Sequence, residues 1–600
     1  MAEDILFGRQ ELLFALVTSI DRRMVRVFFL AFLACEAHGN GASGLWAESE
    51  LVWPQNPIGE KWQAYTLIRG GTIGTPSWPV ALSEICREFD PDTNEVSDAA
   101  FHYNGMKSLL TEECHAKEDP RVFSLTLDLG AYPVDRRYPQ SVPFESFHFG
   151  WGSSQVDPEN GNAWVQIPPV VNTELRYPVS PHSFLYFRLG LRRDFTAWHQ
   201  DPIGSNLPLS EKEVDLNEPS LGYFHAENAV FAFTLGRFPV HWSPSPDFGL
   251  ALSSAVPYHN AAEFALKMPH VRYRFLVSSL NSWLEGTPAG DSSSEDYPVG
   301  SEQYRQRHYV SDHGAGIFHN RVYAENIKTL FAHRLEGSLG PAGVGITETQ
   351  IIGGKVPDLR DAGPFVVFHN DFKDGYTNSA LSLDGVLRLP VGFSLVAELY
   401  MDDVRYAETE DEGGNTASVL GHLAAIRHAF SARGWAFSQS LHAIRTNPYL
   451  YGHRLPLATM VSRHVLASNN QNEGQNPFVD RYVIDYPIGY LRGGDALDFW
   501  YRLEAWHGTR LKLALNAALL AKGEIGLRSP YEGYYSGSQR SPSGIAEREV
   551  RLKLTGSNQL PGEISFHWGL GWQQLWGQAH IEGEERGRGQ VTAGISWTIL

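Results

Sequence analysis

Hydrophobic and polar residues alternate along several short runs of the chain. The run at residues 184–192 has an apolar face of Leu185, Phe187, Leu189 and Leu191 opposite Tyr186, Arg188, Gly190 and Arg192. The last run places Val591, Ala593, Ile595, Trp597 and Ile599 opposite Thr592, Gly594, Ser596 and Thr598. Such alternation predicts strands that have one face toward lipid and the other toward a lumen.

Strand-like runs of this kind recur to the end of the chain, and they are separated by turn residues. Further runs begin at Val122, Leu381, Gly434, Leu511, Val550 and Glu563. Within residues 228–286 the pattern predicts a strand at 229–235, a tight Gly236-Arg237 turn, a polar loop at 239–247, a returning strand at 248–255 and another strand at 271–280. At roughly 25 to 30 residues per strand and loop, residues 119–600 give roughly 16 to 20 strands. The predicted fold is therefore all-β, a transmembrane antiparallel β-barrel.

Three polar connections are long, at residues 193–220, 286–311 and 466–475. In outer-membrane barrels the long loops are extracellular and the short turns are periplasmic. A terminal strand also lets the barrel close without leaving an unpaired edge in lipid, and it suits recognition by the barrel-assembly machinery. A secreted soluble β-protein is the alternative fold.

The N-terminal residues have the pattern of an export signal. A basic lead at residues 21–26 precedes an apolar core at 27–35 and a small-residue exit that ends at Ala47. Residues 1–47 are therefore predicted to be an upstream extension followed by a cleavable signal peptide, with translation starting at Met24. Lipidation at Cys35, which follows a loose lipoprotein box, is the alternative.

Residues 48–118 are predicted to form a small helical region at the periplasmic mouth, with helices at residues 83–89 and 97–115. These helices carry Cys86 and Cys114, the two cysteines that remain once Cys35 is removed. In an oxidising compartment the simplest use of two such cysteines is a disulfide. Two buried free thiols are the alternative.

The composition supports a barrel and excludes one class of partner. Aromatic residues make up 12% of the 600 residues and charged residues only 20%, and there are 57 glycines. Such a composition is typical of a β-barrel, which has glycine-rich turns and girdles of aromatic residues. The formal net charge of −19 argues against nucleic acid, whose phosphates require a basic surface. After the N-terminal region no apolar run is long enough for a membrane-spanning helix.

No sequence motif assigns a catalytic centre, a metal or a cofactor. The hydrolase, zinc-protease, P-loop and CxxC patterns are absent from residues 48–600. Four histidines near the 228–286 region lack metal-ligand spacing and are interpreted as solvated loop or lumen residues: His225, His241, His259 and His270. Acidic turns at 157–162, 402–403 and 408–412 are interpreted as solvated turns rather than calcium sites. A hydrolase whose catalytic serine and histidine are distant in sequence and meet only in the folded protein stays an open alternative.

Carbohydrate sites pair aromatic faces with polar side chains that bind hydroxyl groups. Five tryptophans lie in or beside loops among such residues: Trp151, Trp164, Trp198, Trp242 and Trp283. Each of them is either a sugar contact or an interfacial girdle anchor. The sequence therefore assigns none of them as a ligand contact.

Three segments resemble the Wzi capsule-assembly family of outer-membrane β-barrels. They are GRFPVHWSPSPDFGLALSSAVP at residues 236–257, TPSWPVALSEICREF at 75–89 and GFSLVAELYMDDV at 392–404. The resemblance implies a lectin-like barrel of 18 strands with a small periplasmic helical part and a lumen blocked by loops.

The predicted function is non-catalytic binding or organisation of surface polysaccharide at the bacterial outer membrane, by a monomer that needs no cofactor. Surface polysaccharide, outer-membrane lipid and the barrel-assembly machinery are the expected partners, and nucleic acid is not. Two other functions stay open. A porin or transporter for anionic solutes would suit the lumen-facing Arg188, Arg192 and Arg551. A surface adhesin or antigen is the third function considered.

Overall fold

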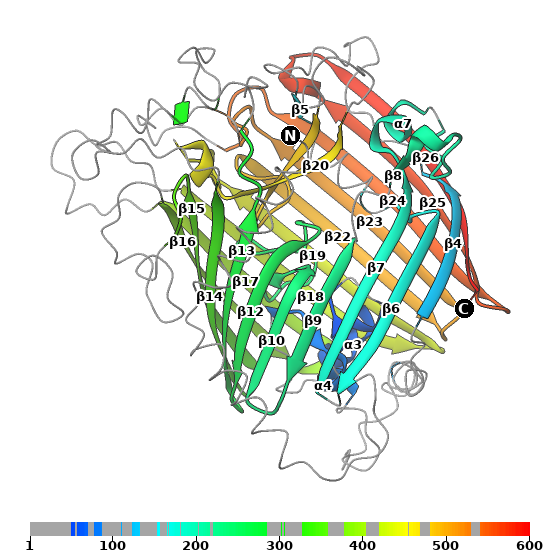
Figure 1. Cartoon of the computed structure of the whole chain (residues 1–600). Helices are drawn as coiled ribbons and strands as arrows, with labels where there is room; N and C mark the ends of the chain where they lie inside the picture. Colours follow the sequence, from blue (N-terminus) through cyan, green and yellow to red (C-terminus); the bar gives the residue numbers. More distant parts are fainter. Residues whose placement is uncertain are drawn as a thin grey trace, which may run out of the picture. The chain divides into compact units, whose positions relative to one another are not determined.

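Eighteen long strands close into an antiparallel barrel (Figure 1). In chain order they are β4 (Phe123–Ala131), β6 (Val171–Ser180), β7 (Ser183–Arg193), β9 (Leu221–Glu227), β10 (Phe231–Phe238), β12 (His259–Lys267), β13 (Val271–Leu280), β14 (Lys328–Leu339), β15 (Ala342–Gly353), β16 (Thr377–Leu389), β17 (Phe393–Asp403), β18 (Val419–Ala432), β19 (Trp435–Thr446), β22 (Ala496–His507), β23 (Leu511–Lys522), β24 (Glu547–Leu560), β25 (Ile564–Trp576) and β26 (Glu585–Thr598). The predicted fold class and strand number are confirmed.

The computed structural model describes residues 50–54, 57–69, 77–86, 110, 123–132, 153–155, 165, 167–180, 182–201, 203–215, 220–284, 302, 305–306, 327–357, 377–403, 419–453, 455–468, 481–527, 529 and 541–599. All of them belong to one compact unit, residues 46–600. Among these residues, no helix has both the length and the apolar character needed to cross a membrane. The predicted leader at residues 1–47, Cys35 included, lies outside the described residues.

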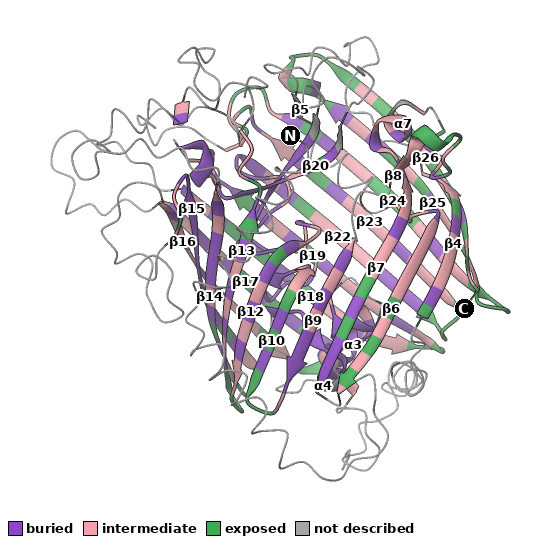
Figure 2. Ribbon diagram, viewed as in Figure 1, coloured by how far each residue is buried: buried purple, intermediate pink, exposed green. Residues whose placement is uncertain are grey.

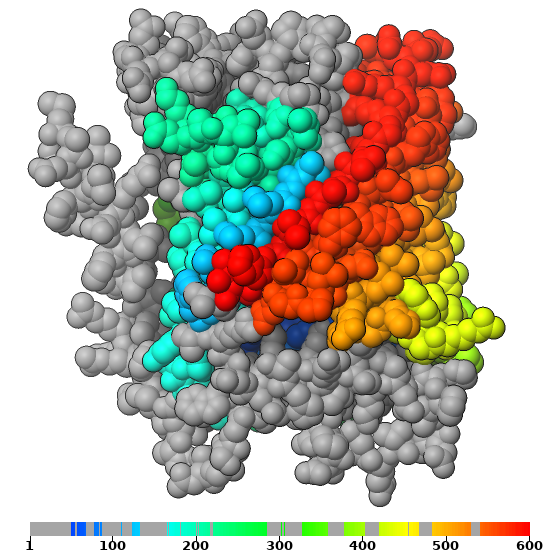
Figure 3. Space-filling view, turned by 90° about the vertical axis from the view of Figure 1, so that its right-hand side faces the viewer, coloured from blue at the N-terminus to red at the C-terminus, as the bar shows by residue number. Residues whose placement is uncertain are grey.

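The barrel closes between its first and last strands. β26 pairs antiparallel with β4 from Ala593 opposite Ala131 to Thr598 opposite Thr126, and the Thr126 and Thr598 hydroxyls are 3.1 Å apart. Figure 3 shows β4 in light blue beside β26 in red. The predicted role of the last strand in closure is confirmed.

Side-chain burial follows the predicted alternation along the wall. Leu185 and Phe187 of β7 are about 40% exposed, whereas Tyr186 between them is 5% exposed. On β10, Phe231 and Phe233 face outward and Ala232 faces inward. Figure 2 shows the resulting green and purple alternation along both strands. Apolar side chains thus cover the outer surface, the surface that lipid covers in a transmembrane barrel.

The connections between wall strands alternate between short turns and long segments. Only residues 268–270 separate β12 from β13, and residues 340–341 separate β14 from β15. Residues 281–327 separate β13 from β14, and residues 447–495 separate β19 from β22. Because neighbouring strands are antiparallel, the short turns gather at one end of the barrel and the long connections gather at the other.

The remaining described elements are shorter, and all of them except η7 occupy the lumen or cover the long-connection end (Figure 1). They are β1 (Leu51–Val52), α3 (Pro57–Arg69), β2 (Ser77–Trp78), β3 (Val80–Ala81), α4 (Leu82–Cys86), β5 (Ser153–Gln155), α7 (Phe195–Gln200), η5 (Glu211–Glu213), β8 (Val214–Asp215), β11 (His241–Trp242), η7 (Pro390–Gly392), η8 (Pro456–Ala458), β20 (Val461–Ser468), β21 (Arg481–Pro487) and η9 (Gln578–His580). Of these, η7 is the short turn between β16 and β17. One apolar core joins lumen residues such as Leu250, Tyr451 and Ile488 to wall residues such as Leu276 and Tyr400.

The described N-terminal residues 50–54, 57–69 and 77–86 lie inside the barrel (Figure 1) and include a helix that the sequence did not predict. That helix, α3, contacts β18 and the η7 turn, which places it at the short-turn end; Figure 1 draws it in blue, enclosed by strands. The predicted helix at 83–89 corresponds to α4, Leu82–Cys86. Of the predicted helix at 97–115, only Leu110 is described, and it is helical.

Cys86 is disulfide-bonded. Cys114 lies outside the described residues, so the proposed pairing stays a prediction.

Two predictions near β10 are wrong. Gly236 and Arg237 do not form a turn, because both pair with β9 and β12 within β10. Gly236 has φ +137°, and a Cβ there would lie 2.2 Å from the Gly222 carbonyl oxygen.

Residues 248–255 are not a wall strand either. They belong to residues 239–258, which we call the lumen segment, where Leu250 and Leu252 are fully buried in the core that fills the lumen.

Candidate ligand-binding site in the barrel lumen

The lumen segment is anchored to the wall by a carboxylate. Glu398 of β17 accepts hydrogen bonds from the Ser243 hydroxyl at 2.7 Å and from the backbone N–H groups of Leu250 and Ala251 at 3.0 and 3.1 Å. The Ser382 hydroxyl of β16 adds a fourth at 3.2 Å. A buried carboxylate is tolerable when its oxygens accept several hydrogen bonds. Glu398 therefore fixes both halves of the lumen segment to the same point of the wall.

A neutral histidine stabilises the fold of the lumen segment itself. His241 Nε2 lies 2.6 Å from the Ser245 carbonyl oxygen, and His241 Nδ1 lies 3.2 Å from the Ser254 backbone nitrogen. Because a carbonyl oxygen only accepts and a backbone N–H only donates, Nε2 carries the proton and Nδ1 does not. Burial lowers the pKa of His241 to about 4, so the ring is uncharged at neutral pH.

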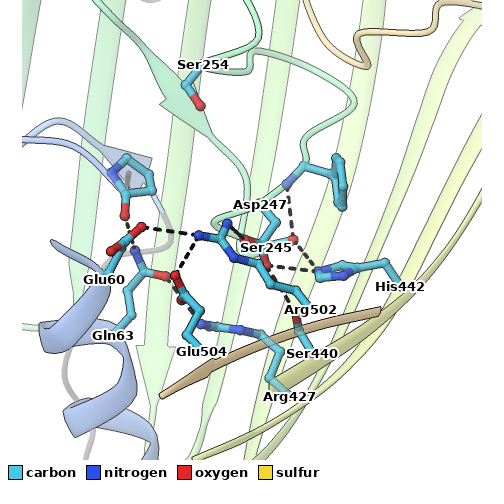
Figure 4. Close-up of polar contacts among 12 residues, drawn as sticks. Glu60, Gln63, Ser245, Asp247, Ser254, Arg427, Ser440, His442, Arg502 and Glu504 are labelled. Atoms are coloured by element: carbon cyan, nitrogen blue, oxygen red, sulfur yellow. Dashed lines mark hydrogen bonds and ion pairs between the residues drawn. The ribbon is translucent and has the colours of Figure 1, made fainter. Parts of the chain in front are cut away.

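Asp247 joins the lumen segment to β22 and β19. Arg502 donates to it at 2.9 Å and the Ser440 hydroxyl at 3.3 Å, as Figure 4 shows. Burial would raise the pKa of Asp247, but Arg502, His442 and Arg427 outweigh that effect and hold the pKa at about 2. The carboxylate is therefore ionised at any physiological pH.

Helix α3 meets the same arginine from the opposite side. Glu60 accepts from Arg502 at 3.2 Å and also pairs with Lys512 of β23. Gln63, one turn further along, accepts from Arg427 of β18 at 3.2 Å. Arg502 thus links the lumen segment and α3 (Figure 4), and this network explains why a helix with buried polar residues is stable in the lumen.

A serine and a histidine do meet in space, but without the geometry of a catalytic triad. Ser245 Oγ lies 3.1 Å from His442 Nε2, and Asp247 Oδ2 lies 3.5 Å from the same nitrogen. In a triad the acid and the nucleophile use different ring nitrogens. Among the described residues, His442 Nδ1 has no hydrogen-bond partner, and His442 is fully buried. The pair therefore supports packing rather than nucleophilic attack.

Beside this network lies a cavity of about 620 Å³, bounded by the lumen segment, residues 490–492 and the inner wall of β22 to β26. Three aromatic rings form one side of it. The Phe248 ring centre is 5.3 Å from that of Trp500 and 5.9 Å from that of Tyr490. Trp500 Nε1 donates to the Tyr490 hydroxyl at 3.1 Å, which fixes the indole against the connection that precedes β22.

The rest of the cavity lining is polar. Hydrogen-bonding side chains come from β23 to β26: Asn516, Thr555, Ser557, Gln573, Gln590 and Thr592. Basic side chains are added by Arg492, Arg502, Lys512, Arg551 and Lys553. A concave surface with clustered rings and convergent polar groups is the usual form of a small-ligand or sugar site. The cavity is therefore the candidate site.

The structure places the sequence candidates in different surroundings. Trp198 and Trp242 are fully buried, so neither is an interfacial anchor; Trp198 also lines the cavity. The Trp283 carbonyl accepts from Arg463. Trp151 and Trp164 lie outside the described residues.

The four predicted histidines do not form a group with a shared role. His225, His241 and His259 are buried, so describing them as solvated was wrong, and only His270 is exposed, in the β12–β13 turn. Among the described residues, no group of histidine, cysteine and carboxylate side chains could hold a metal ion. Asp402 instead accepts from the Tyr451 backbone at 2.8 Å, and the acidic turns at 157–162 and 408–412 lie outside the described residues.

The arginines predicted for the lumen face divide between two uses. Arg551 lines the cavity. Arg188 donates to the Ser220 hydroxyl at 2.9 Å, and Arg192 donates to the Val165 carbonyl at 3.1 Å, so these two hold segments of the long-connection end. The cavity residues Phe248, Tyr490 and Trp500 were missed. Their only sequence signal was aromatic character within or beside a long connection.

Of the comparisons with known proteins, the structural one bears on the fold. No protein-family model matches the sequence, and no curated protein sequence is significantly similar to it. The structure is similar to Wzi of Escherichia coli, described as an outer-membrane protein involved in group 1 capsule assembly and as a carbohydrate-binding β-barrel. That match has 13% identity and a TM-score of 0.52, and it covers 92% of this chain and 99% of Wzi. The expected Wzi-like fold is confirmed.

A second structure found in the comparison is OccD3 of Pseudomonas aeruginosa, with 11% identity and a TM-score of 0.35, covering 80% of this chain and 92% of that one.

Proposed function

We propose that this protein is an outer-membrane barrel that binds or organises surface polysaccharide and catalyses no reaction. The observation that carries the proposal is the lumen cavity, where Phe248, Tyr490 and Trp500 lie beside polar side chains. A sugar ring has an apolar face that packs on an aromatic ring and hydroxyl groups that need hydrogen-bond partners. The similarity in fold to a carbohydrate-binding barrel supports the same function.

The proposed location is the outer membrane, and the apolar outer surface of the wall supports it. Export by the predicted signal peptide, a monomeric state and insertion by the barrel-assembly machinery belong to the same proposal. Surface polysaccharide and lipid are the proposed partners.

The test is direct binding to the purified protein in detergent. Surface polysaccharide from the cells that make the protein is titrated, and tryptophan fluorescence is followed because Trp500 lies in the cavity wall. We expect saturable binding to the folded barrel and none after boiling. Absence of saturable binding to the folded, heat-modifiable protein would contradict the proposal.

Conductance in planar lipid bilayers separates this function from that of a porin or transporter. Residues of the lumen segment and of 447–495 pack against the wall in the lumen core, so we expect no steady open pore. A steady pore would favour the transporter instead. Binding to host proteins together with silence on a glycan array would favour the adhesin.

A further inference from the structure

We infer that the lumen cavity takes acidic saccharides, meaning chains that carry carboxylate or phosphate groups, in preference to neutral ones. This inference rests on the proposed function and names the chemical class of its ligand. It follows from the charges that line the cavity, from how their partners are buried, and from the position of one arginine beside a ring.

The described residues that line the cavity include five basic side chains and no acidic one: Arg492, Arg502, Lys512, Arg551 and Lys553. The chain as a whole has the opposite bias, with 68 acidic and 49 basic residues. A basic lining is therefore not a consequence of composition. It is a local feature of β22, β23 and β24 and of the connection before them.

For three of these basic groups, a carboxylate partner is more deeply buried than the basic group itself. Arg502 is 29% exposed and its partner Glu504 is 9% exposed. Lys512 is 32% exposed and its partner Glu60 is 10% exposed. Arg551 is 25% exposed and its partner Glu549 is 1% exposed. The salt bridges fix the positions of the basic groups, and the cavity surface that a ligand meets is cationic. Holding donors in place before a ligand arrives reduces the entropy lost on binding.

The basic groups and the aromatic rings are neighbours. The Arg551 guanidinium carbon lies 6.0 Å from the centre of the Trp500 ring, and the Phe248 ring lies on the lumen-segment side of that indole. One acidic sugar can therefore pack on Trp500 and place its anionic group beside Arg551. Charge-assisted hydrogen bonds from arginine and lysine to carboxylate or phosphate are stronger than neutral ones. A neutral sugar would gain the ring contact and the hydroxyl contacts but not the charge-assisted hydrogen bond.

The test uses two forms of one polysaccharide. Surface polysaccharide from the producing cells is compared with the same material after chemical reduction of its carboxyl groups, which leaves chain length and linkage unchanged. We expect at least about tenfold weaker binding of the reduced form, since the loss of one charge-assisted contact has about that effect. If carboxyl reduction has no effect but removal of phosphate with hydrogen fluoride has, the anionic group is phosphate.

The outcomes separate this inference from the function on which it rests. Equal binding of the native, reduced and dephosphorylated forms would overturn the preference for acidic saccharides and leave polysaccharide binding intact. Binding of none of them would contradict the proposed function itself.

Matched variants place the preference in the cavity. Lys553→Gln and Arg551→Gln should each weaken binding of the native polysaccharide by about tenfold and weaken binding of the reduced form by clearly less. Their controls, Lys212→Gln on η5 and Arg510→Gln in the β22–β23 turn, make the same charge change at exposed positions outside the cavity. A heat-modifiable band confirms that each variant is folded. Equal effects of cavity and control variants would contradict binding in the cavity.

Discussion

The Ser243 hydroxyl donates a hydrogen bond of 2.7 Å to Glu398 across 155 residues of sequence. The two residues belong to two of the three segments that resemble the Wzi family. The third segment joins them, because His241 and Trp242 of β11 pair with Trp78 and Ser77 of β2. The similar segments are therefore the places where the internal elements of the barrel meet each other and the wall.

Glu398→Ala should release the lumen segment from the wall. The substitution leaves the buried N–H groups of Leu250 and Ala251 without their acceptor, at roughly 1–3 kcal/mol for each group. We expect faster proteolysis within residues 239–258 and a lower unfolding temperature in detergent. Glu582→Ala, at an exposed position between β25 and β26, is the control. Unchanged proteolysis of the E398A barrel would show that other contacts hold the segment.

Gly236→Ala should destabilise the barrel by about 1–3 kcal/mol, because φ +137° is accessible almost only to glycine and the new Cβ would meet the Gly222 carbonyl oxygen at 2.2 Å. Gly589→Ala on β26 is the matched control, since nothing lies within 4 Å of a Cβ there. The unfolding temperature by circular dichroism measures both. A similar change in the two variants would contradict a special requirement at Gly236.

Acidification should destabilise the lumen segment. The pKa of His241 is about 4 in the folded protein and 6.5 ordinarily, so between these values the unfolded chain binds a proton that the folded chain does not. Stability therefore falls as pH drops from 6.5 to 4, by on the order of 3 kcal/mol for this group. Asp247, with a pKa of about 2 against 3.8, adds a further loss as pH drops from 3.8 to 2.

The variant His241→Gln separates the first effect from the general acid response. Glutamine can donate to the Ser245 carbonyl as Nε2 does, but it binds no proton in this range. Its unfolding temperature should vary less between pH 4 and 6.5 than that of the native protein. Parallel curves for the two proteins would exclude His241 as the source.

Trp500→Leu should weaken polysaccharide binding by roughly tenfold, because an aromatic contact contributes about 0.5–1.5 kcal/mol beyond the area that it buries. Trp597→Leu on β26 removes an indole from the outer face, where it is 48% exposed, and should leave affinity unchanged. Titration calorimetry with the surface polysaccharide measures both. An equal loss in the two variants would argue against a sugar contact at Trp500.

The wall could be predicted from the sequence because each strand residue meets one of only two surroundings. Leu185 and Tyr186 differ in polarity because one faces outward and the other faces the lumen. The period-2 pattern records that difference locally, and it indicated both the strands and the closing role of β26.

The lumen contents could not be predicted in the same way. Leu250 and Leu252 resemble a strand in sequence, but they lie in the lumen core, where Leu250 contacts residues as distant in sequence as Glu398 and Tyr451. Glu60 and Gln63 gave α3 a polar sequence, and their partners Arg502 and Arg427 are on distant strands. The cavity could not be predicted for the same reason, since Phe248 and Trp500 become neighbours only when the barrel has closed.

The pairing of β26 with β4 has a consequence for biogenesis. A ring of strands is completed only when its last member is in place, so the seam stays open until residues near the C-terminus reach the membrane. The lumen segment and α3 are joined to the wall at many points and are enclosed once the seam is sealed. After that step the only routes into the lumen are the two ends of the barrel, so sealing of the seam ends the period in which the lumen can be filled from the side.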